Sequence, residues 1–98
     1  MVKMENNSFI RFFGSSGCRD CLKLFVFLNK YSIPYEYIDA NDESCEMQNF
    51  CDEHNVDQLP HIEFVVNNKV IFRHIGSLSE SDLNKIHSLT LIISKENN

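Results

Sequence analysis

The sequence lacks several features that define whole classes of protein. It has no tryptophan, only three glycines and two prolines, and no run of lysine or arginine in 98 residues. So little glycine and proline, together with 43% hydrophobic residues, excludes a disordered chain. No apolar run approaches the ~18 residues of a membrane span, so we expect no membrane partner. The net charge of −5 argues against nucleic acid as a partner.

A chain of 98 residues has the length of one domain, which we assign to residues 1–98 with a core at about 8–93. A domain of this size buries roughly two thirds of its unfolded surface, so it can fold without metal or disulfide staples. Residues 1–8 contain no continuous apolar stretch of the kind found in a signal peptide. We expect a monomer, and we expect it in the reducing cytoplasm.

Hydrophobic periodicity and turn residues predict seven elements in the order β-α-β-α-β-β-α. Short apolar or alternating runs predict strands at 8–13, 35–39, 62–66 and 69–74. Asn67 and Asn68 can supply the positive φ angles of a hairpin between the last two strands. The first two strands are joined by a helix and are therefore parallel. A helix on each side of the sheet gives a three-layer α/β domain with a mixed four-stranded sheet.

Three segments have the length and apolar spacing of helices. Residues 18–31 are apolar on nearly every side, which predicts a well-buried helix. Asn41 or Asp42 is expected to cap the second helix, and Asn55 to end it in a left-handed conformation. The last helix follows residues 77–79 and has an apolar stripe formed by Leu83, Ile86, Leu89 and Ile93.

Four cysteines are too few for a disulfide-stapled scaffold. Two of them, Cys18 and Cys21, form a C-x-x-C motif that follows a strand and a Gly/Ser loop and opens a helix. Unpaired N–H groups and the helix dipole at such a position lower a thiol pKa from about 8.5 to roughly 3.5–7.5. Cys21 lies one turn further along nearly the same face, within reach of a disulfide. We therefore predict a redox pair in which Cys18 attacks and Cys21 resolves the mixed disulfide.

Arg19 and Asp20 lie between the two cysteines and are expected to tune them. Arg19 stabilises a thiolate and Asp20 opposes it, which predicts a reduction potential of about −200 to −270 mV. Two other interpretations of the motif stay open, namely half of a structural zinc site or a pair of inert thiols. The candidates for further zinc ligands are Cys45, Cys51, His54 and His61. We expect no metal, because these candidates do not form a second ligand pair of the usual spacing.

The residues around this motif resemble the active site of dithiol glutaredoxins, in which Pro-Tyr usually fills the places of Arg19 and Asp20. The stretch 33–39, Ile-Pro-Tyr-Glu-Tyr-Ile-Asp, is similar to the second strand of that family. The stretch 56–62, Val-Asp-Gln-Leu-Pro-His-Ile, looks like the segment with the cis-proline of the thioredoxin superfamily. The resemblance covers about residues 8–93 and implies a thioredoxin-like fold.

The resemblance also implies a thiol–disulfide oxidoreductase that reduces protein disulfides or mixed disulfides with glutathione. Pro60 would be cis and lie against the attacking cysteine, and the backbone of Leu59 would pair with a substrate peptide. Gly76 and Ser77 would join Leu59 and Arg19 as donors to the carboxylates of glutathione. Glutathione is the expected co-substrate and no cofactor is bound tightly. Glutathione or a flavoprotein thioredoxin reductase would return the electrons.

Departures from the glutaredoxin pattern make the chain a hybrid. Ser15 and Ser16 stand where glutaredoxins usually have a basic residue for glutathione, and Gly76-Ser77 replaces their paired glycines. The hairpin at 60–76 is longer than in a small glutaredoxin and is similar to that of thioredoxin. However, the Trp-Cys-Gly-Pro-Cys of thioredoxin is absent, and Phe12 lies where thioredoxin buries an acidic residue.

A second class of function stays open for this sequence. It is a thioredoxin-like adaptor, or a carrier of a metal or cluster, in which the cysteines hold a ligand or have no role. A narrower alternative is a dedicated electron donor to one enzyme, such as ribonucleotide reductase. Outside the motif, Cys51 is expected to be buried on an apolar stripe and Cys45 to be exposed. His61 and His74 are interpreted as polar residues at strand ends.

Overall fold

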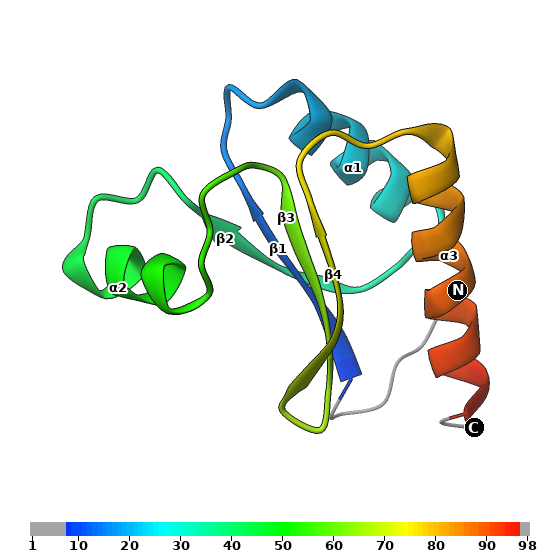
Figure 1. Cartoon of the computed structure of the whole chain (residues 1–98). Helices are drawn as coiled ribbons and strands as arrows, with labels where there is room; N and C mark the ends of the chain where they lie inside the picture. Colours follow the sequence, from blue (N-terminus) through cyan, green and yellow to red (C-terminus); the bar gives the residue numbers. More distant parts are fainter. Residues whose placement is uncertain (1–7, 97–98) are drawn as a thin grey trace.

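The computed structural model describes residues 8–96 of the chain, with side chains as far as residue 92. It contains strands β1 (Ser8–Gly14), β2 (Tyr35–Asp39), β3 (His61–Val66) and β4 (Lys69–Ile75), and helices α1 (Arg19–Lys30), α2 (Cys45–Glu53) and α3 (Glu80–Glu96) (Figure 1). The predicted order of elements and the three-layer α/β architecture are confirmed. None of the described helices is long and apolar enough to cross a membrane.

The four strands form one mixed sheet in the order β2-β1-β3-β4. β1 and β2 are parallel, as expected for strands joined by a helix, whereas β3 is antiparallel to both β1 and β4. Asn67 and Asn68 have φ angles of 52° and 67° and form the tight turn between β3 and β4 that the sequence predicts. β1 and β3 are therefore the interior strands of the sheet, and β2 and β4 are its edges.

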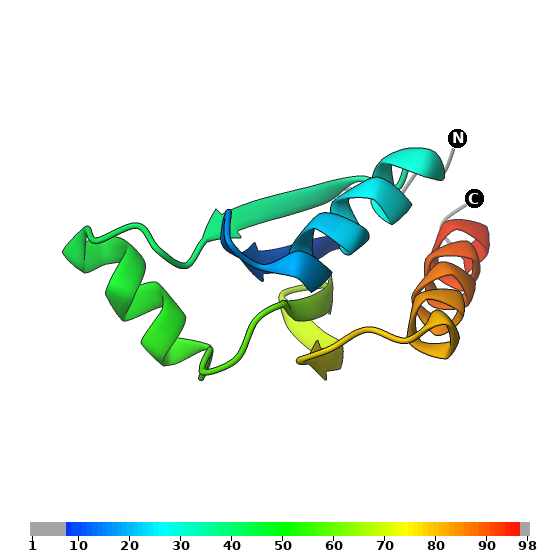
Figure 2. The same ribbon diagram turned by 90° about the horizontal axis from the view of Figure 1, so that it is seen from above.

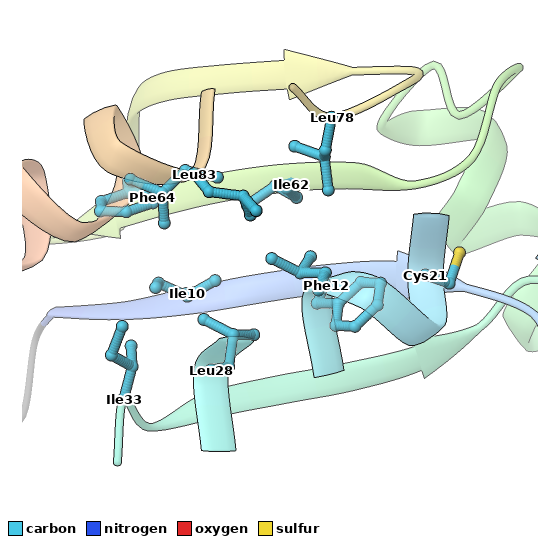
Figure 3. Close-up of a cluster of buried hydrophobic side chains, with 11 residues drawn as sticks. Ile10, Phe12, Cys21, Leu28, Ile33, Ile62, Phe64, Leu78 and Leu83 are labelled. Carbon is cyan, nitrogen blue, oxygen red and sulfur yellow. The ribbon is translucent and has the colours of Figure 1, made fainter. Parts of the chain in front are cut away.

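The sheet separates two hydrophobic cores. The larger core lies between the sheet and helices α1 and α3, and Figure 3 shows several of its side chains, including Ile10, Phe12, Leu28, Ile62 and Phe64. The smaller core lies under α2, which Figure 2 shows well apart from α1 and α3, and it contains Phe13, Ile38 and Cys51. Successive residues of a strand point to opposite faces, so Phe12 and Phe13 belong to different cores.

The prediction that α1 is buried on nearly every side is wrong. The helix buries Cys21, Leu24 and Leu28, which lie on one face at helical spacing. On the opposite face, Leu22 and Val26 are 65% and 62% exposed. A helix packed on a sheet buries one face only, and no described element packs against the outer side of α1. The apolar residues on that side are therefore available to solvent.

The predicted cap of α2 is also wrong. The helix begins at Cys45, and Ser44 is its N-cap, with the Ser44 hydroxyl accepting a hydrogen bond from the Met47 N–H at 3.2 Å. Asp42 instead accepts a hydrogen bond from the Ser44 N–H at 2.9 Å, in the turn before the helix. Asn55 follows the helix with a φ of 56°, as predicted.

A reciprocal pair of hydrogen bonds fixes the start of α3. The Asp82 carboxylate accepts from the Ser79 N–H at 2.9 Å, and the Ser79 hydroxyl accepts from the Asp82 N–H at 3.1 Å. Of the predicted apolar stripe, Leu83 and Ile86 are buried in the larger core and Leu89 packs against it. Ile93 lies outside the described side chains. The stripe therefore attaches α3 to the same face of the sheet as α1.

Candidate active site

Three loops of the chain meet at one end of the sheet, where strands begin or end. His61, the first residue of β3, pairs with Phe13 near the end of β1 and with Ile75 at the end of β4. The loop between β1 and α1, the loop before β3 and the loop after β4 therefore lie at the same end of the sheet. The Gly76 N–H donates a hydrogen bond to the Pro60 carbonyl at 2.9 Å and joins two of these loops directly.

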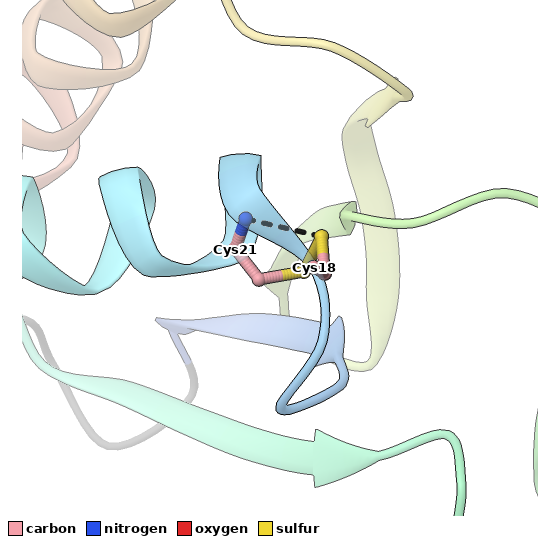
Figure 4. The surroundings of a disulfide bond; sticks show 2 residues. All are labelled: Cys18 and Cys21. Atoms are coloured by element: carbon pink, nitrogen blue, oxygen red, sulfur yellow. Dashed lines mark hydrogen bonds between the residues drawn. A yellow bond between two sulfur atoms is a disulfide. The ribbon is translucent and has the colours of Figure 1, made fainter.

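Cys18 and Cys21 form a disulfide at the N-terminal end of α1, at this same end of the sheet (Figure 4). Their Cα atoms are 5.1 Å apart, and the predicted pairing is confirmed. Cys18 is the N-cap residue of α1, and its Sγ accepts a hydrogen bond from the Cys21 N–H at 3.1 Å. A backbone N–H aimed at the sulfur, at the positive end of a helix dipole, stabilises a thiolate.

The two sulfur-bearing residues differ in their access to solvent. Cys18 is half-buried and lines a pocket, whereas Cys21 is 0% exposed and belongs to the larger core. Gly14 leaves the room that Cys21 needs, because a Cβ atom at Gly14 would lie 3.0 Å from the Cys21 Sγ and 2.9 Å from the Phe12 ring. A partner can therefore approach Cys18, while Cys21 can act only from inside the protein.

The residues that the resemblance assigns to substrate binding lie at the same end of the sheet as the disulfide. The Leu59–Pro60 peptide bond is cis, as expected. Pro60 is fully buried and Leu59 is half-buried. Gly76, with a φ of +91°, lies against Pro60, and Ser77 follows it on the exposed turn before α3. The fold thus brings these four residues together at the end of the sheet where the disulfide lies.

Few cationic side chains lie near the disulfide. Arg19 is exposed in the first turn of α1 and lines the pocket beside Cys18, and Asp20 next to it is half-buried. One turn further, the Lys23 ammonium donates a hydrogen bond to the Leu78 carbonyl at 2.8 Å, which joins α1 to the loop before α3. Lys23 therefore supports the fold, and Arg19 is the cation in the pocket.

The arrangement of helices and strands matches known structures over nearly the whole chain. The thioredoxin of Malassezia sympodialis aligns with 95% of this chain and 80% of its own, with a TM-score of 0.70 and 16% identity. Thioredoxin O2 of Arabidopsis thaliana, in its oxidised state, aligns with 89% of this chain and 75% of its own, with a TM-score of 0.69 and 16% identity.

The chain has the thioredoxin fold. A further structure, of a malarial protein, aligns with 88% of this chain and 99% of its own, with a TM-score of 0.66 and 18% identity. No family model and no curated protein matches the sequence. The likeness is thus one of fold, and it places the Cys18–Cys21 disulfide in a scaffold shared with thioredoxins.

The described residues do not assemble the zinc site that one interpretation of the motif required. Across residues 8–92, no group of three or more His, Cys, Asp or Glu side chains is placed to hold a metal ion. Cys45 is exposed and Cys51 is buried, as the sequence predicts, and both are free thiols. Neither joins the disulfide. His54 and His61, the remaining candidates, bind a carboxylate on the other face of the sheet.

That carboxylate belongs to Glu63, the centre of a buried ionic cluster within this thioredoxin fold. Glu63 is 0% exposed, three residues after Pro60 on β3. Four side chains surround its carboxylate: Arg11 on β1, His61 on β3, Arg73 on β4 and His54 at the C-cap of α2. Their nitrogen–oxygen distances to Glu63 are 3.0, 3.1, 3.4 and 3.0 Å, respectively. The cluster ties α2 to the three strands β1, β3 and β4, and so fixes the loop that leads to Pro60.

His61 lies at the start of β3, as the strand-end interpretation predicts, but its ring is 0% exposed, which the sequence did not indicate. Its Nε2 donates to Glu63, while its Nδ1 is buried without a hydrogen-bond partner among the described residues. Burial lowers the pKa of His61, and Glu63 opposes this only in part. Burial alone would raise the pKa of Glu63, but hydrogen bonds from His54, His61 and Arg11 outweigh it and lower that pKa. At neutral pH Glu63 is therefore ionised and His61 is neutral.

The stability of the protein is expected to fall on acidification. Below the ordinary His pKa of 6.5 the unfolded chain takes up a proton at His61 that the folded chain resists. Below the ordinary Glu pKa of 4.5 the unfolded chain protonates Glu63 while the folded chain keeps it charged. Each group destabilises by at most about 1.4 kcal/mol per pH unit in its range. Urea unfolding at a series of pH values measures both losses.

The variant His61→Gln separates the two losses. Glutamine can keep a hydrogen bond to Glu63 but does not titrate, so the loss that begins below about pH 6.5 should disappear while the loss below pH 4.5 remains. An unfolding midpoint of the wild-type protein that stays constant from pH 7 to pH 5 would contradict the assignment of a neutral His61.

Proposed function

We propose that the protein is a thiol–disulfide oxidoreductase that reduces disulfides of client proteins with the Cys18/Cys21 pair. The observation that carries the proposal is the disulfide at the N-terminal end of α1, with Cys18 accessible and Cys21 buried behind it. A half-exposed sulfur that accepts a backbone hydrogen bond is suited to attack, and a buried second sulfur is suited to resolve. The thioredoxin fold is consistent with this chemistry.

The reaction proceeds in two exchanges. The Cys18 thiolate attacks one sulfur of the client disulfide, the client S–S bond breaks, and the other client sulfur leaves as a thiolate that takes up a proton. Cys21 then loses its proton and attacks the Cys18 sulfur, which releases the second client thiol. The client gains two electrons and two protons, and the protein is left with the Cys18–Cys21 disulfide.

The client peptide is held by the loops beside the disulfide. Pro60 is buried and cannot donate a backbone hydrogen bond, whereas the half-buried Leu59 directly before it has both a backbone N–H and a carbonyl. The backbone of Leu59 pairs with the client as an added strand. Gly76 and Ser77, which adjoin Pro60, complete this side of the site.

The oxidised protein needs two electrons from a reductant to begin again. The two candidate sources are two molecules of glutathione and a flavoprotein thioredoxin reductase. Comparison of turnover with glutathione plus glutathione reductase against turnover with NADPH plus thioredoxin reductase distinguishes them. Glutathione has two carboxylates, but Arg19 is the one cationic residue that lines the pocket beside Cys18, so we place the flavoprotein reductase first.

The variant Cys21→Ser tests the order of the two exchanges. Cys18 should still attack a client disulfide, but nothing resolves the product, so the client stays covalently bound through Cys18. Non-reducing gel electrophoresis with a disulfide-containing client such as insulin should show a mixed disulfide that dithiothreitol releases. The double variant with Cys18→Ser should show none. A stable adduct of the double variant would mean that another sulfur attacks.

A further inference from the structure

A pocket lies beside Cys18 on the side opposite to Pro60. It lies between α1 and β2, its volume is about 490 Å³, and Cys18 itself forms part of its lining. Because β2 and β3 flank β1 on opposite sides, the pocket and the Leu59–Pro60 loop lie on opposite sides of the sulfur. A substrate attached to Cys18 therefore meets two distinct surfaces.

The wall of the pocket is apolar and held in place by aromatic packing. Leu22, Phe25 and Tyr37 form this wall. The rings of Phe25 and Tyr37 have centroids 4.9 Å apart, and both pack on the buried Phe12 at 4.8 and 5.3 Å. Leu22 is 65% exposed, although it directly follows Cys21 and lies one helical turn from Cys18. This wall is preformed, so binding an apolar group there needs little rearrangement.

We propose that this pocket binds an apolar side chain adjacent to the attacked cysteine of a client protein. The inference rests on the proposed function, and it names the substrate class. The first exchange joins the client sulfur to the Cys18 sulfur, so the residues on either side of the client cysteine lie within reach of the pocket. The occupant is thus a segment of the client. An apolar side chain gains by leaving water there, in contact with Leu22 and Phe25.

The pocket is poorly matched to glutathione. That tripeptide has two carboxylates, which bind best to arginine or lysine, and Arg19 is the one cationic residue in the lining. The net charge of the chain, −5, also disfavours a small anion. A client cysteine flanked by leucine-like residues is better matched to the wall.

Two peptides that differ only beside the cysteine test the proposal. One has leucine on each side of a single cysteine, the other has serine, and both cysteines are joined to thionitrobenzoate. Attack by Cys18 on the peptide sulfur releases the coloured thionitrobenzoate anion, which absorbance follows. Each molecule of reduced protein reacts once, so the rate is measured in a single turnover with the peptide in excess. We expect the second-order rate constant to be about tenfold higher for the leucine peptide, with most of the difference in the peptide concentration that gives half the maximal rate.

Matched variants locate the preference in the pocket. Leu22→Gln removes the exposed part of the wall and should reduce the preference for the leucine peptide to about twofold or less. Leu91→Gln is the control, since Leu91 is a 46% exposed helical leucine on α3 that does not line the pocket, and it should keep the full preference. Gly17→Leu should also reduce the preference, because a Cβ at Gly17 meets nothing within 4 Å and the new side chain can occupy the pocket.

The outcomes distinguish this inference from the function on which it rests. If the reduced protein releases thionitrobenzoate from neither peptide faster than free cysteine does, the proposed function itself fails. If it reacts rapidly but equally with both peptides, the function stands and the pocket proposal is overturned. Loss of the preference in Leu91→Gln as well as in Leu22→Gln would also overturn the proposal, because the effect would not belong to the pocket.

Discussion

Replacing Cys18 with serine is expected to reduce disulfide reductase activity to the uncatalysed rate. A serine hydroxyl is not ionised near neutral pH, so it cannot attack a disulfide as the thiolate does. Cys21 cannot substitute for it, because Cys21 is 0% exposed and no client sulfur can reach it. Reduction of insulin by dithiothreitol, followed by turbidity, measures the effect.

The control for this prediction is Cys45→Ser. Cys45, like Cys18, lies at the N-terminal end of a helix, but it is an exposed free thiol without a partner and belongs to α2. Its replacement should leave activity within about twofold of the wild type. If Cys18→Ser kept a tenth or more of the activity, or if Cys45→Ser lost as much as Cys18→Ser, the site would have been assigned to the wrong cysteine.

Replacing Glu63 with leucine is expected to cause a large loss of stability. The change leaves Arg11, whose side chain is 15% exposed, without its carboxylate partner, and it leaves the buried Nε2 of His61 without an acceptor. Removing one partner of a buried ion pair costs about 3–5 kcal/mol. A domain is stable by only about 5–15 kcal/mol, so a large part of the stability is lost. The midpoint of urea unfolding, followed by circular dichroism, measures this loss.

Two further variants test whether the uncompensated charge is the cause. Glu36→Leu, at an exposed position of β2, should change stability by no more than about 0.5 kcal/mol. Adding Arg11→Met to Glu63→Leu removes the orphaned guanidinium and should recover part of the loss. A loss below about 1 kcal/mol in Glu63→Leu would show that the cluster does not hold the three strands and α2 together.

Much of the fold could be predicted because local signals agree with the final packing. The asparagine pair at 67 and 68, the left-handed Asn55 and the alternation in β3 each specify a backbone conformation that no distant residue overrides. The C-x-x-C motif was placed at a helix start by the Gly/Ser loop before it, and Cys18 is indeed the N-cap residue. Short-range stereochemistry was sufficient at these positions.

Sequence reasoning failed where partners come from distant elements. Leu22 and Val26 are as apolar as Leu24 and Leu28, and only the position of the sheet decides which pair is buried. Serine, asparagine and aspartate can all cap a helix, so residue type does not distinguish Asn41, Asp42 and Ser44. Ser44 is the cap because the Asp42 carboxylate accepts from the Ser44 N–H in the turn before the helix, which leaves the Ser44 hydroxyl to accept from Met47. Such choices depend on geometry that residue type alone does not determine.

The Glu63 cluster was missed for the same reason. Its members are separated by up to 62 positions, from Arg11 to Arg73, and no motif links them. One signal was available: Glu63 lies between Ile62 and Phe64, in an interior strand buried on both faces. A carboxylate at such a position needs cationic or hydrogen-bonding partners. Arginine and histidine on neighbouring strands were the residues to look for.

The most direct test of the account is the rate at which iodoacetamide alkylates Cys18 of the reduced protein at pH 6. The account requires a thiolate that is stabilised by the N-terminal end of α1, where the Cys21 N–H is directed at the sulfur. We predict that Cys18 reacts at least about tenfold faster than the cysteine of an unstructured peptide, as measured by mass spectrometry of the labelled fragment. Equal rates for Cys18 and the peptide cysteine would contradict the account.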